Sequence, residues 1–255
     1  MAQTQKMYLG GVPVIKNYLG ENPIVSANQP TFPYTIEYLV YAGGGNGGTI
    51  NSGLRGAGGG GAGGLLSGSA TIIPTTIYQV KAGIAAQDSY FTGSLIYQYA
   101  IAGGAGGDSP DGNGAAGGSG GGGAGTTGLG AAGIINQGNS GSNAGGLTTG
   151  AGGGGAGGAA SGRSGGAGKT SSISGTSLTY CQGGSGGSNN GSATFRGFGG
   201  NGGANDGVPS AGIAGGGEVI IRYLGPQKGS GGTVTTDGAY IIHTFTSGST
   251  STYIG

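Results

Sequence analysis

The sequence contains few of the residues on which ordinary protein chemistry depends. Among 255 residues there are one cysteine, one histidine, no tryptophan and eight prolines, and only 7% of the residues are charged. The single cysteine, Cys181, excludes an internal disulfide, so no oxidising compartment is implied. Eight prolines are too few for a collagen triple helix. The formal net charge of +1 provides no attraction toward nucleic acid, an acidic substrate or an anionic membrane.

Long hydrophobic runs are also missing. No segment has the roughly 20 consecutive apolar residues that a membrane-spanning helix needs. Residues Met1–Gly10 lack the apolar stretch of a secretory signal. We therefore expect a chain that is made without a cleaved leader and is not inserted into a membrane.

Glycine is abundant instead, at 73 of 255 residues. Within Gly103–Gly217 many glycines recur at every third position, as in Gly152, Gly155 and Gly158. A period of three is that of an extended left-handed helix of the polyproline II type, which makes no internal hydrogen bonds. Such helices can bond laterally where glycines face one another. The run is therefore either a stack of polyglycine II helices or a disordered linker.

Two features of this run favour the ordered stack. Glycine alternates with alanine rather than with charged residues, whereas disordered segments tend to carry high net charge. The run is also interrupted by β-type segments, Ser172–Tyr180 and Glu218–Tyr223. Aromatic residues make up only 7% of the chain, so a conventional apolar core cannot extend through all of it. We expect dense backbone hydrogen bonding to stabilise the glycine-rich part.

Strand patterns flank the glycine runs. Tyr34–Ala42 is the clearest strand, rich in β-branched and aromatic residues, and it leads directly into three glycines. Ser94–Ala102 is a further apolar strand that leads into Gly103 and Gly104, and Ser177–Cys181 and Val219–Leu224 repeat the arrangement. The pattern indicates that the strands end at one common edge and that glycine helices extend from that edge.

Two hairpins are predicted. Ala70–Ile73 and Ile77–Ala82 form one around the turn Pro74-Thr75-Thr76. Thr233–Gly255 forms another, with Asp237-Gly238 as its turn and Tyr240–Phe245 as a strand.

The predicted fold class is therefore mainly β plus a polyglycine II helix stack, with almost no α-helix. We expect four regions: an N-terminal attachment arm, a β-rich base, a glycine-rich body with β segments, and a C-terminal β-hairpin segment. Their predicted bounds are 1–33, 34–102, 103–224 and 225–255.

The attachment arm contains a short internal repeat. Lys6-Met7-Tyr8-Leu9-Gly10 is followed ten residues later by Lys16-Asn17-Tyr18-Leu19-Gly20, and each copy is typical of a strand followed by a glycine turn. Two such units are too short to be stable alone. The arm either adds to a partner's sheet or forms a hairpin packed on the body. Its candidate attachment residues are Tyr8, Leu9, Tyr18 and Leu19.

The sequence offers no catalytic constellation. Gly165–Thr170 resembles a phosphate-binding loop, but the required first glycine is replaced by Arg163. His243 lies in an alternating strand without a cysteine or carboxylate cluster, so we expect a sheet residue facing solvent or a neighbour. Cys181 is expected to be a buried small apolar residue. The eight acidic residues never pair at a spacing typical of acid–base catalysis or a calcium loop. We predict no enzyme, no metal and no cofactor.

The sequence contains the segments Ile36–Gly45, Gly217–Tyr223 and Gly238–Thr246. All three resemble segments of the glycine-rich virion proteins of tailed phages, in particular tail-fibre and adhesin proteins. The glycine-rich part is similar to adhesins that fold as polyglycine II sandwiches with receptor-binding loops at one end, and the resemblance covers most of the chain. It implies a virion location, with a host cell-surface receptor and other virion structural proteins as partners, and a homotrimer as one oligomeric state.

In a stack of this kind the chemically diverse side chains lie where the chain reverses. The segments expected there are Gln87–Phe91, Ile134–Asn143, Ser188–Phe198 and Asn205–Ile213. Aromatic and arginine side chains suit a contact surface, although Phe195 and Phe198 could instead cap the apolar edge of the stack. The candidate receptor-binding residues are Tyr90, Phe91, Asn136, Gln137, Phe195, Arg196 and Phe198.

Two other functions remain open at the level of sequence. One is a purely structural capsid fibre, tail fibre or decoration protein held by the attachment arm. The other, less favoured, is an ice-binding protein, because flat polyglycine II stacks can present regular surfaces. Against it, threonine and alanine do not recur at one fixed place in the triplets.

Overall fold

The computed structural model describes residues 32–50, 56–145, 149–187, 197–199 and 212–255 in full, and residues 6–9, 12–15, 17–18 and 23–24 as backbone. These parts contain strands and no helix, which confirms the mainly β prediction, and they hold no helix long and apolar enough to cross a bilayer. The strands are β1 (Lys6–Leu9), β2 (Val12–Ile15), β3 (Asn17–Tyr18), β4 (Pro23–Ile24), β5 (Tyr34–Tyr41), β6 (Leu65–Ile72), β7 (Ile77–Lys81), β8 (Ser89–Gly93), β9 (Ile96–Ala100), β10 (Lys169–Ser171), β11 (Leu178–Tyr180), β12 (Glu218–Leu224), β13 (Thr233–Asp237), β14 (Tyr240–Phe245) and β15 (Thr250–Ile254).

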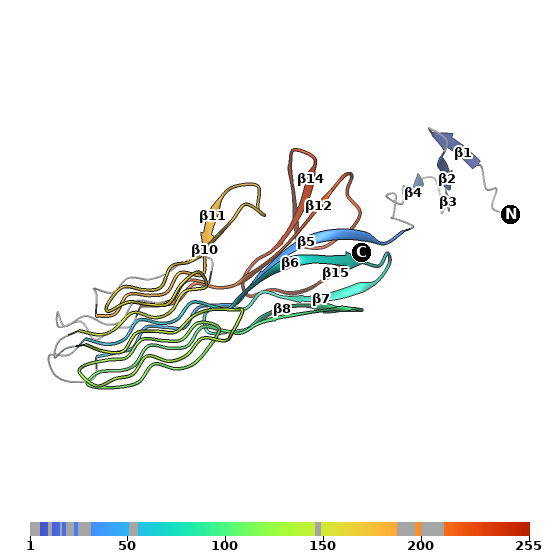
Figure 1. Ribbon diagram of the computed structural model, residues 1–255. Coiled ribbons are helices and arrows are strands. Elements are labelled where there is room, and N and C mark those ends of the chain that lie inside the picture. Colours follow the sequence, from blue (N-terminus) through green and yellow to red (C-terminus); the bar gives the residue numbers. More distant parts are fainter. Residues whose placement is uncertain are drawn as a thin grey trace.

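Two antiparallel sheets pack face to face at one end of the molecule (Figure 1). One sheet has the strand order β13-β14-β12-β5-β6 and the other the order β15-β7-β8-β9. Strand residues alternate between the two faces of a sheet, so one set from each sheet points into the space between them. That space holds the larger core cluster, which includes Ile36, Tyr38, Val40, Tyr78, Val80, Phe91, Val219, Ile221, Phe245 and Tyr253.

The outer face of the five-stranded sheet is covered by the hairpin of β10 and β11. Ile173 and Tyr180 of this hairpin are buried in a second apolar cluster with Leu39, Ile220 and Ile242 of the sheet. These sheet residues alternate with those that face the first core, which explains why β5 and β12 are apolar at almost every position.

The expected strand at Tyr34–Ala42 is confirmed as β5. The expected C-terminal hairpin is confirmed for β13 and β14, but β15, at the end of the predicted range Thr233–Gly255, pairs with β7 in the other sheet. Gly238 lies in the turn between β13 and β14 with φ +57°. The predicted hairpin around Pro74-Thr75-Thr76 is wrong. β6 pairs with β5, whereas β7 pairs with β15 and β8, so this turn carries the chain from one sheet to the other. Local alternation identifies a strand but not the sheet that it joins.

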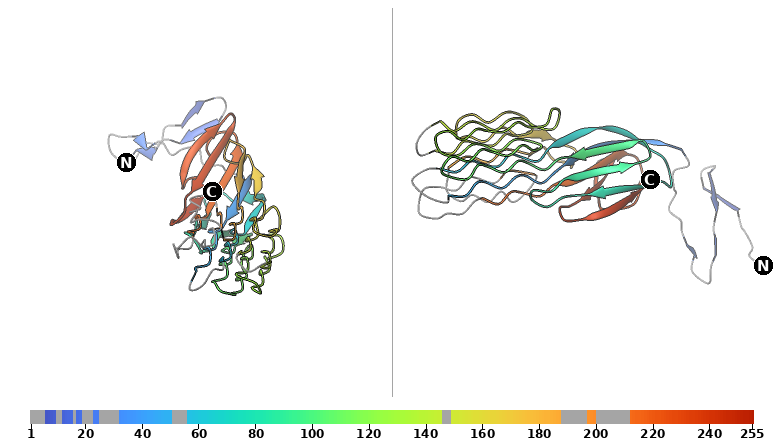
Figure 2. Two further views of the ribbon diagram at one scale, coloured as in Figure 1. Left: turned by 90° about the vertical axis from the view of Figure 1, so that its left-hand side faces the viewer. Right: turned by 90° about the horizontal axis from the view of Figure 1, so that it is seen from below.

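In the structure the glycine-rich body comprises the described residues of 42–64, 101–168 and 181–217. It therefore includes 42–64, which the predicted bounds assign to the β-rich base, and it excludes β12, which belongs to the five-stranded sheet. Its extended segments run beside one another away from the sandwich (Figure 2). Within the segment 56–64, the amides of Gly58, Gly61 and Gly64 donate to carbonyls of one neighbour, the segment 101–107, at 2.8–2.9 Å. The direction of hydrogen bonding therefore repeats every third residue.

Other amides of the segment 56–64 donate hydrogen bonds to different neighbouring segments. Gly59 and Ala62 donate to the segment 150–155, and Gly63 donates to Gly197. Its carbonyl groups accept amide protons from three further segments. The segment thus has backbone neighbours on six sides: 42–48, 101–107, 118–124, 150–155, 181–187 and 197–199.

The segments lie too close together for side chains between them. A Cβ atom added to Gly61 would lie 2.1 Å from the carbonyl oxygen of Ser119, and one added to Gly58 would lie 2.0 Å from that of Gly122. Distances this short do not occur between real Cβ and oxygen atoms, so these positions require glycine.

The attachment arm contains β1–β4. β1 pairs with β2 and β3 pairs with β4, both antiparallel, and within the described residues these strands have no other strand partner. Tyr8 and Leu9 belong to β1 and Tyr18 belongs to β3. Leu19 lies outside the described residues. The attachment role of these four residues stays a prediction.

Candidate functional site

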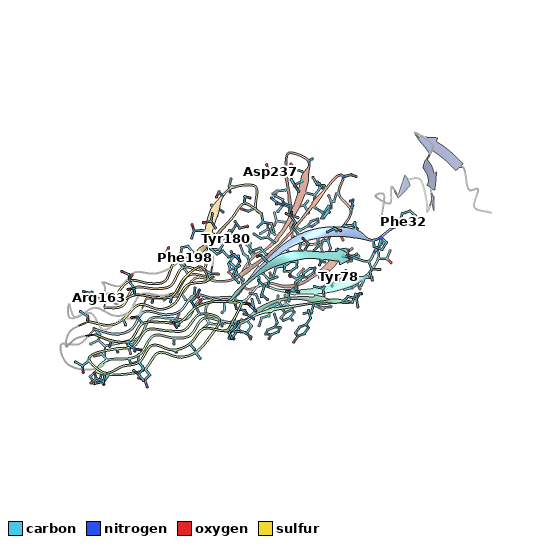
Figure 3. All side chains as sticks on the ribbon, viewed as in Figure 1. Phe32, Tyr78, Arg163, Tyr180, Phe198 and Asp237 are labelled. Atoms are coloured by element: carbon cyan, nitrogen blue, oxygen red, sulfur yellow. The ribbon has the colours of Figure 1, made fainter. Side chains whose placement is uncertain are left out.

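The end of the glycine-rich body remote from the sandwich consists of chain reversals. Arg163 lies at this end, whereas Phe32 lies at the opposite end of the molecule (Figure 3). The described reversals there are the turns at 108–111, 125–127 and 161–164. We call them the loop end.

Two aspartates fix the turns of the loop end. Oδ1 of Asp108 accepts hydrogen bonds from the amide (2.7 Å) and the hydroxyl (2.8 Å) of Thr49. Oδ1 of Asp111 accepts in the same way from Thr126, at 2.6 and 2.8 Å, and from the amide of Thr127 at 3.2 Å. Hydrogen bonds to an ionised carboxylate are among the stronger ones. These carboxylates therefore hold neighbouring reversals together and leave other side chains of the loop end for contact.

Arg163 anchors the chain immediately before the candidate segment Ser188–Phe198. Its Nη2 donates to the carbonyl oxygen of Gly187 at 2.6 Å, and its Nε donates to that of Gly186 at 3.4 Å. Gly187 is the last described residue before 188–196. The candidates Phe195 and Arg196 lie in that stretch, outside the described residues.

Phe91 is not a receptor-binding residue. Its side chain is fully buried between the two sheets, with its ring centroid 5.7 Å from that of Tyr78 and 6.4 Å from that of Tyr253. The alternation of β8 places Phe91 inward and Tyr90 outward. The sequence segment Gln87–Phe91 was expected to be a surface loop, but its last residues belong to a paired strand.

Asn136 and Gln137 lie at the junction between the body and the four-stranded sheet. The side chain of Gln137 accepts from the amide of Ile101 and donates to the carbonyl oxygen of Tyr99, both at 2.9 Å. These are backbone groups at the free edge of β9, so the Gln137 amide extends the sheet. Asn136 has φ +67° in the adjoining turn. Their local role is to join the two parts of the molecule.

Phe198 is half-buried where the body meets the sandwich, near Tyr180 (Figure 3). Its carbonyl oxygen accepts from the amide of Gly215 at 2.9 Å. This is the location expected for a residue that caps the apolar edge of the stack, the alternative that the sequence left open.

Tyr90, a candidate receptor-binding residue named from the sequence, belongs to a tyrosine surface whose other members were not predicted from the sequence. Tyr90, Tyr97 and Tyr99 lie on the outer face of the four-stranded sheet, and the rings of Tyr90 and Tyr99 are stacked with centroids 5.6 Å apart. Tyr97 and Tyr99 are also stacked, at 6.3 Å, and Tyr97 is 76% exposed. The alternation Tyr-x-Tyr in β9 was the available signal, because it places both rings on the face opposite Ile96.

His243 is buried in a hydrogen-bonded network rather than exposed to solvent. Its Nδ1 donates to the carbonyl oxygen of Gly231 at 2.7 Å. The hydroxyl of Tyr223 accepts from the amides of Lys228 and Gly229 and donates to Nε2 of His243 at 2.9 Å. This pattern assigns a neutral imidazole, and burial lowers the pKa of His243. Both ring nitrogens are used within the fold.

Cys181 is buried and forms no disulfide, as the sequence predicted. Burial raises the pKa of its thiol, which removes the thiolate needed for nucleophilic attack or metal binding. Among the described residues no three histidine, cysteine, aspartate or glutamate side chains come together in a way that could hold a metal ion.

Comparisons with protein-family models, with curated proteins and with solved structures found no match.

Proposed function

We propose that this protein is a surface protein of a tailed-phage virion that binds a host receptor through loops carried on a stack of polyglycine II helices. The observation that carries the proposal is the segment 56–64 with its six backbone neighbours. In a helix with three residues per turn, successive amides point about 120° apart. Each helix then donates backbone hydrogen bonds to three neighbouring helices and accepts them from three others.

The hydrogen bonds of this segment support such packing. It donates to 101–107, 150–155 and 197–199, and it accepts from 42–48, 118–124 and 181–187. A body built in this way is held by backbone hydrogen bonds and has no room for an internal binding pocket between its segments. Side-chain chemistry is then confined to its surface and its two ends.

The loop end is suited to recognition because its turns are attached to a body that is held by backbone hydrogen bonds. Reversals that are tied to a hydrogen-bonded body need little further ordering on binding, and preorganisation of this kind favours affinity. Functional residues are often carried on loops that a rigid scaffold positions. The resemblance to tailed-phage adhesins points to the same arrangement. The attachment arm, at the N-terminus of the sequence, would then join the protein to other virion proteins.

Adsorption of virions to host cells tests the proposal. Particles carrying the double variant Phe195→Ala and Arg196→Ala should adsorb at least about tenfold more slowly, since aromatic and arginine contacts can each contribute about 2 kcal/mol of binding. Phe198 is left intact because it lies at the junction with the sandwich. Particles carrying Leu95→Ala are the matched control, because Leu95 is 93% exposed in the turn between β8 and β9 of the sandwich and is not a candidate contact residue.

The control particles should adsorb normally, and both variant proteins should incorporate into particles and melt as the parent does. If the double variant adsorbs as fast as the control, this loop does not bind the receptor. A structural role in a capsid or tail fibre would then replace the proposed one.

A further inference from the structure

The five-stranded sheet divides at the end remote from the glycine-rich body. β5 and β12 pair from Tyr41 and Glu218 only as far as Glu37 and Arg222. Beyond that point β5 continues to Tyr34 alongside β6, and β12 continues alongside β14. Figure 1 shows β12 and β14 diverging from β5 here.

A cavity of about 240 Å³ occupies the gap between the diverging strands. We call it the strand gap. Its walls come from β5 and β12, with β6, β14 and the turn after β12 completing it. The lining includes Thr35, Glu37, Ser69, Arg222, Leu224 and Lys228.

The walls of the strand gap are open strand edges. In an antiparallel sheet, alternate residues of a strand point their N–H and C=O groups toward opposite neighbours. Residues 34–36 of β5 pair with β6 on one side, and residues 223–224 of β12 pair with β14 on one side. Within the part of the chain that the structure describes, neither group has a strand partner across the gap. Both walls therefore present backbone groups in the manner of an edge strand.

The strand gap also contains a cation without a carboxylate partner. Among the described residues Lys228 forms no ion pair, and its Nζ lies 5.1 Å from the ring centroid of Tyr34 and 5.8 Å from that of Tyr223. Its main-chain amide donates to the Tyr223 hydroxyl at 3.0 Å, which fixes the position of the residue.

The other cation of the gap is already compensated. Nε and Nη2 of Arg222 both donate to Glu37 Oε2, and Nη1 donates to the carbonyl oxygen of Ser172 at 3.0 Å. One positive charge, that of Lys228, is therefore left for a ligand.

We propose that the strand gap binds an extended peptide segment of a partner protein, which lies between β5 and β12 and places a carboxylate on Lys228. Backbone hydrogen bonds to open strand edges are the usual basis of peptide recognition by strand addition. The uncompensated cation selects an acidic residue or a chain terminus at one position. Leu224, 56% exposed, offers an apolar contact beside it.

This site lies at the sandwich end, remote from the loop end, so it goes beyond the proposed function and does not depend on receptor binding. A peptide held here would attach the protein to its partner.

Calorimetric titration with short probes tests the proposal. The blocked pentapeptide TVEVT should bind at least about tenfold more tightly than TVQVT, because only the former supplies a charge-assisted bond to Lys228. Acetate and glucuronate should both bind more weakly than TVEVT. In NMR spectra of the backbone amides, the chemical-shift changes caused by TVEVT should be largest at residues 34–37 and 222–228.

Two lysine variants complete the experiment. Lys228→Gln should abolish the preference for TVEVT over TVQVT, whereas Lys81→Gln, on β7 of the other sheet, should keep it. Thermal melting should show that both variants fold. Equal binding of the two peptides, binding of acetate or glucuronate as tight as that of TVEVT, or no binding at millimolar peptide would each overturn the proposal. Loss of adsorption by the Phe195/Arg196 double variant does not bear on this outcome.

Discussion

The guanidinium of Arg222 on β12 bonds the carboxylate of Glu37 on β5 at the last pair of residues that joins these two strands. The same guanidinium lies 4.4 Å from the ring centroid of Tyr240 and donates to the carbonyl oxygen of Ser172, which belongs to the covering hairpin. One side chain therefore links three elements: the two central strands and the hairpin over their outer face.

Replacing Arg222 by methionine should destabilise the sandwich. The apolar stem is kept, but the bonds to Glu37 and Ser172 are lost. Arg222 is 16% exposed and Glu37 is 46% exposed, so solvent screens part of the interaction. We expect a loss of about 1–2 kcal/mol in the free energy of unfolding, measured by urea denaturation.

Lys81→Met is the control for this variant, since it removes a cation from the other sheet. It should change the free energy of unfolding by less than about 0.5 kcal/mol. Equal effects of the two substitutions would show that the Arg222 contacts add no stability.

Glycine positions in the body should differ sharply in their tolerance of alanine. An alanine Cβ at Gly61 would lie 2.1 Å from a backbone oxygen, which cannot move without separating two segments. Gly61→Ala should therefore cost more than about 4 kcal/mol or prevent folding. Gly158 is the matched control, because the nearest atom to its added Cβ is 3.8 Å away.

Gly158→Ala should be neutral or raise stability by up to about 1 kcal/mol, since alanine restricts the unfolded chain. Thermal melting of the two single variants distinguishes these outcomes. Similar melting temperatures would contradict the close packing of the segments.

Stability should fall as the pH is lowered through the range in which His243 titrates. The folded state keeps His243 neutral, with a lowered pKa, whereas the unfolded chain binds a proton near pH 6.5. Below that value the unfolded state binds more protons, so the free energy of unfolding decreases by up to about 1.4 kcal/mol per pH unit until the folded pKa is reached. Above about pH 7.5 His243 is neutral in both the folded and the unfolded state, so its titration no longer lowers the free energy of unfolding.

Urea denaturation at pH 7.5 and 5.5 measures this dependence. The variant His243→Gln should be less stable at pH 7.5 but should show a smaller decrease on acidification. The same decrease in parent and variant would mean that other groups cause it.

The sequence predicted most strands, because alternation is a local pattern, as in β5. It did not predict the extent of the glycine-rich body, since the segment 56–64, whose hydrogen bonds repeat every third residue, lies outside the run Gly103–Gly217. Partner choice was not predictable in this way. β6 and β7 are adjacent in sequence yet join different sheets, since burial of residues such as Ile72 and Val80 decides their pairing.

The candidate site was harder to predict than the fold. Phe91 is aromatic, as many contact residues are, but its side chain lies on the face of β8 that packs into the core. Gln137 is a polar turn residue whose side chain satisfies backbone groups of β9. Lys228 gains its importance only from the divergence of β5 and β12, two strands that are far apart in the sequence.

Amide hydrogen exchange across residues 56–64 tests the central claim most directly. If this segment is bonded to neighbours on six sides, the amides of Gly58, Gly61 and Gly64 should exchange as slowly as those of β5, despite lying outside any sheet. Exchange of these three amides at the rate of an unstructured glycine chain, in a protein whose β5 amides remain protected, would contradict the account.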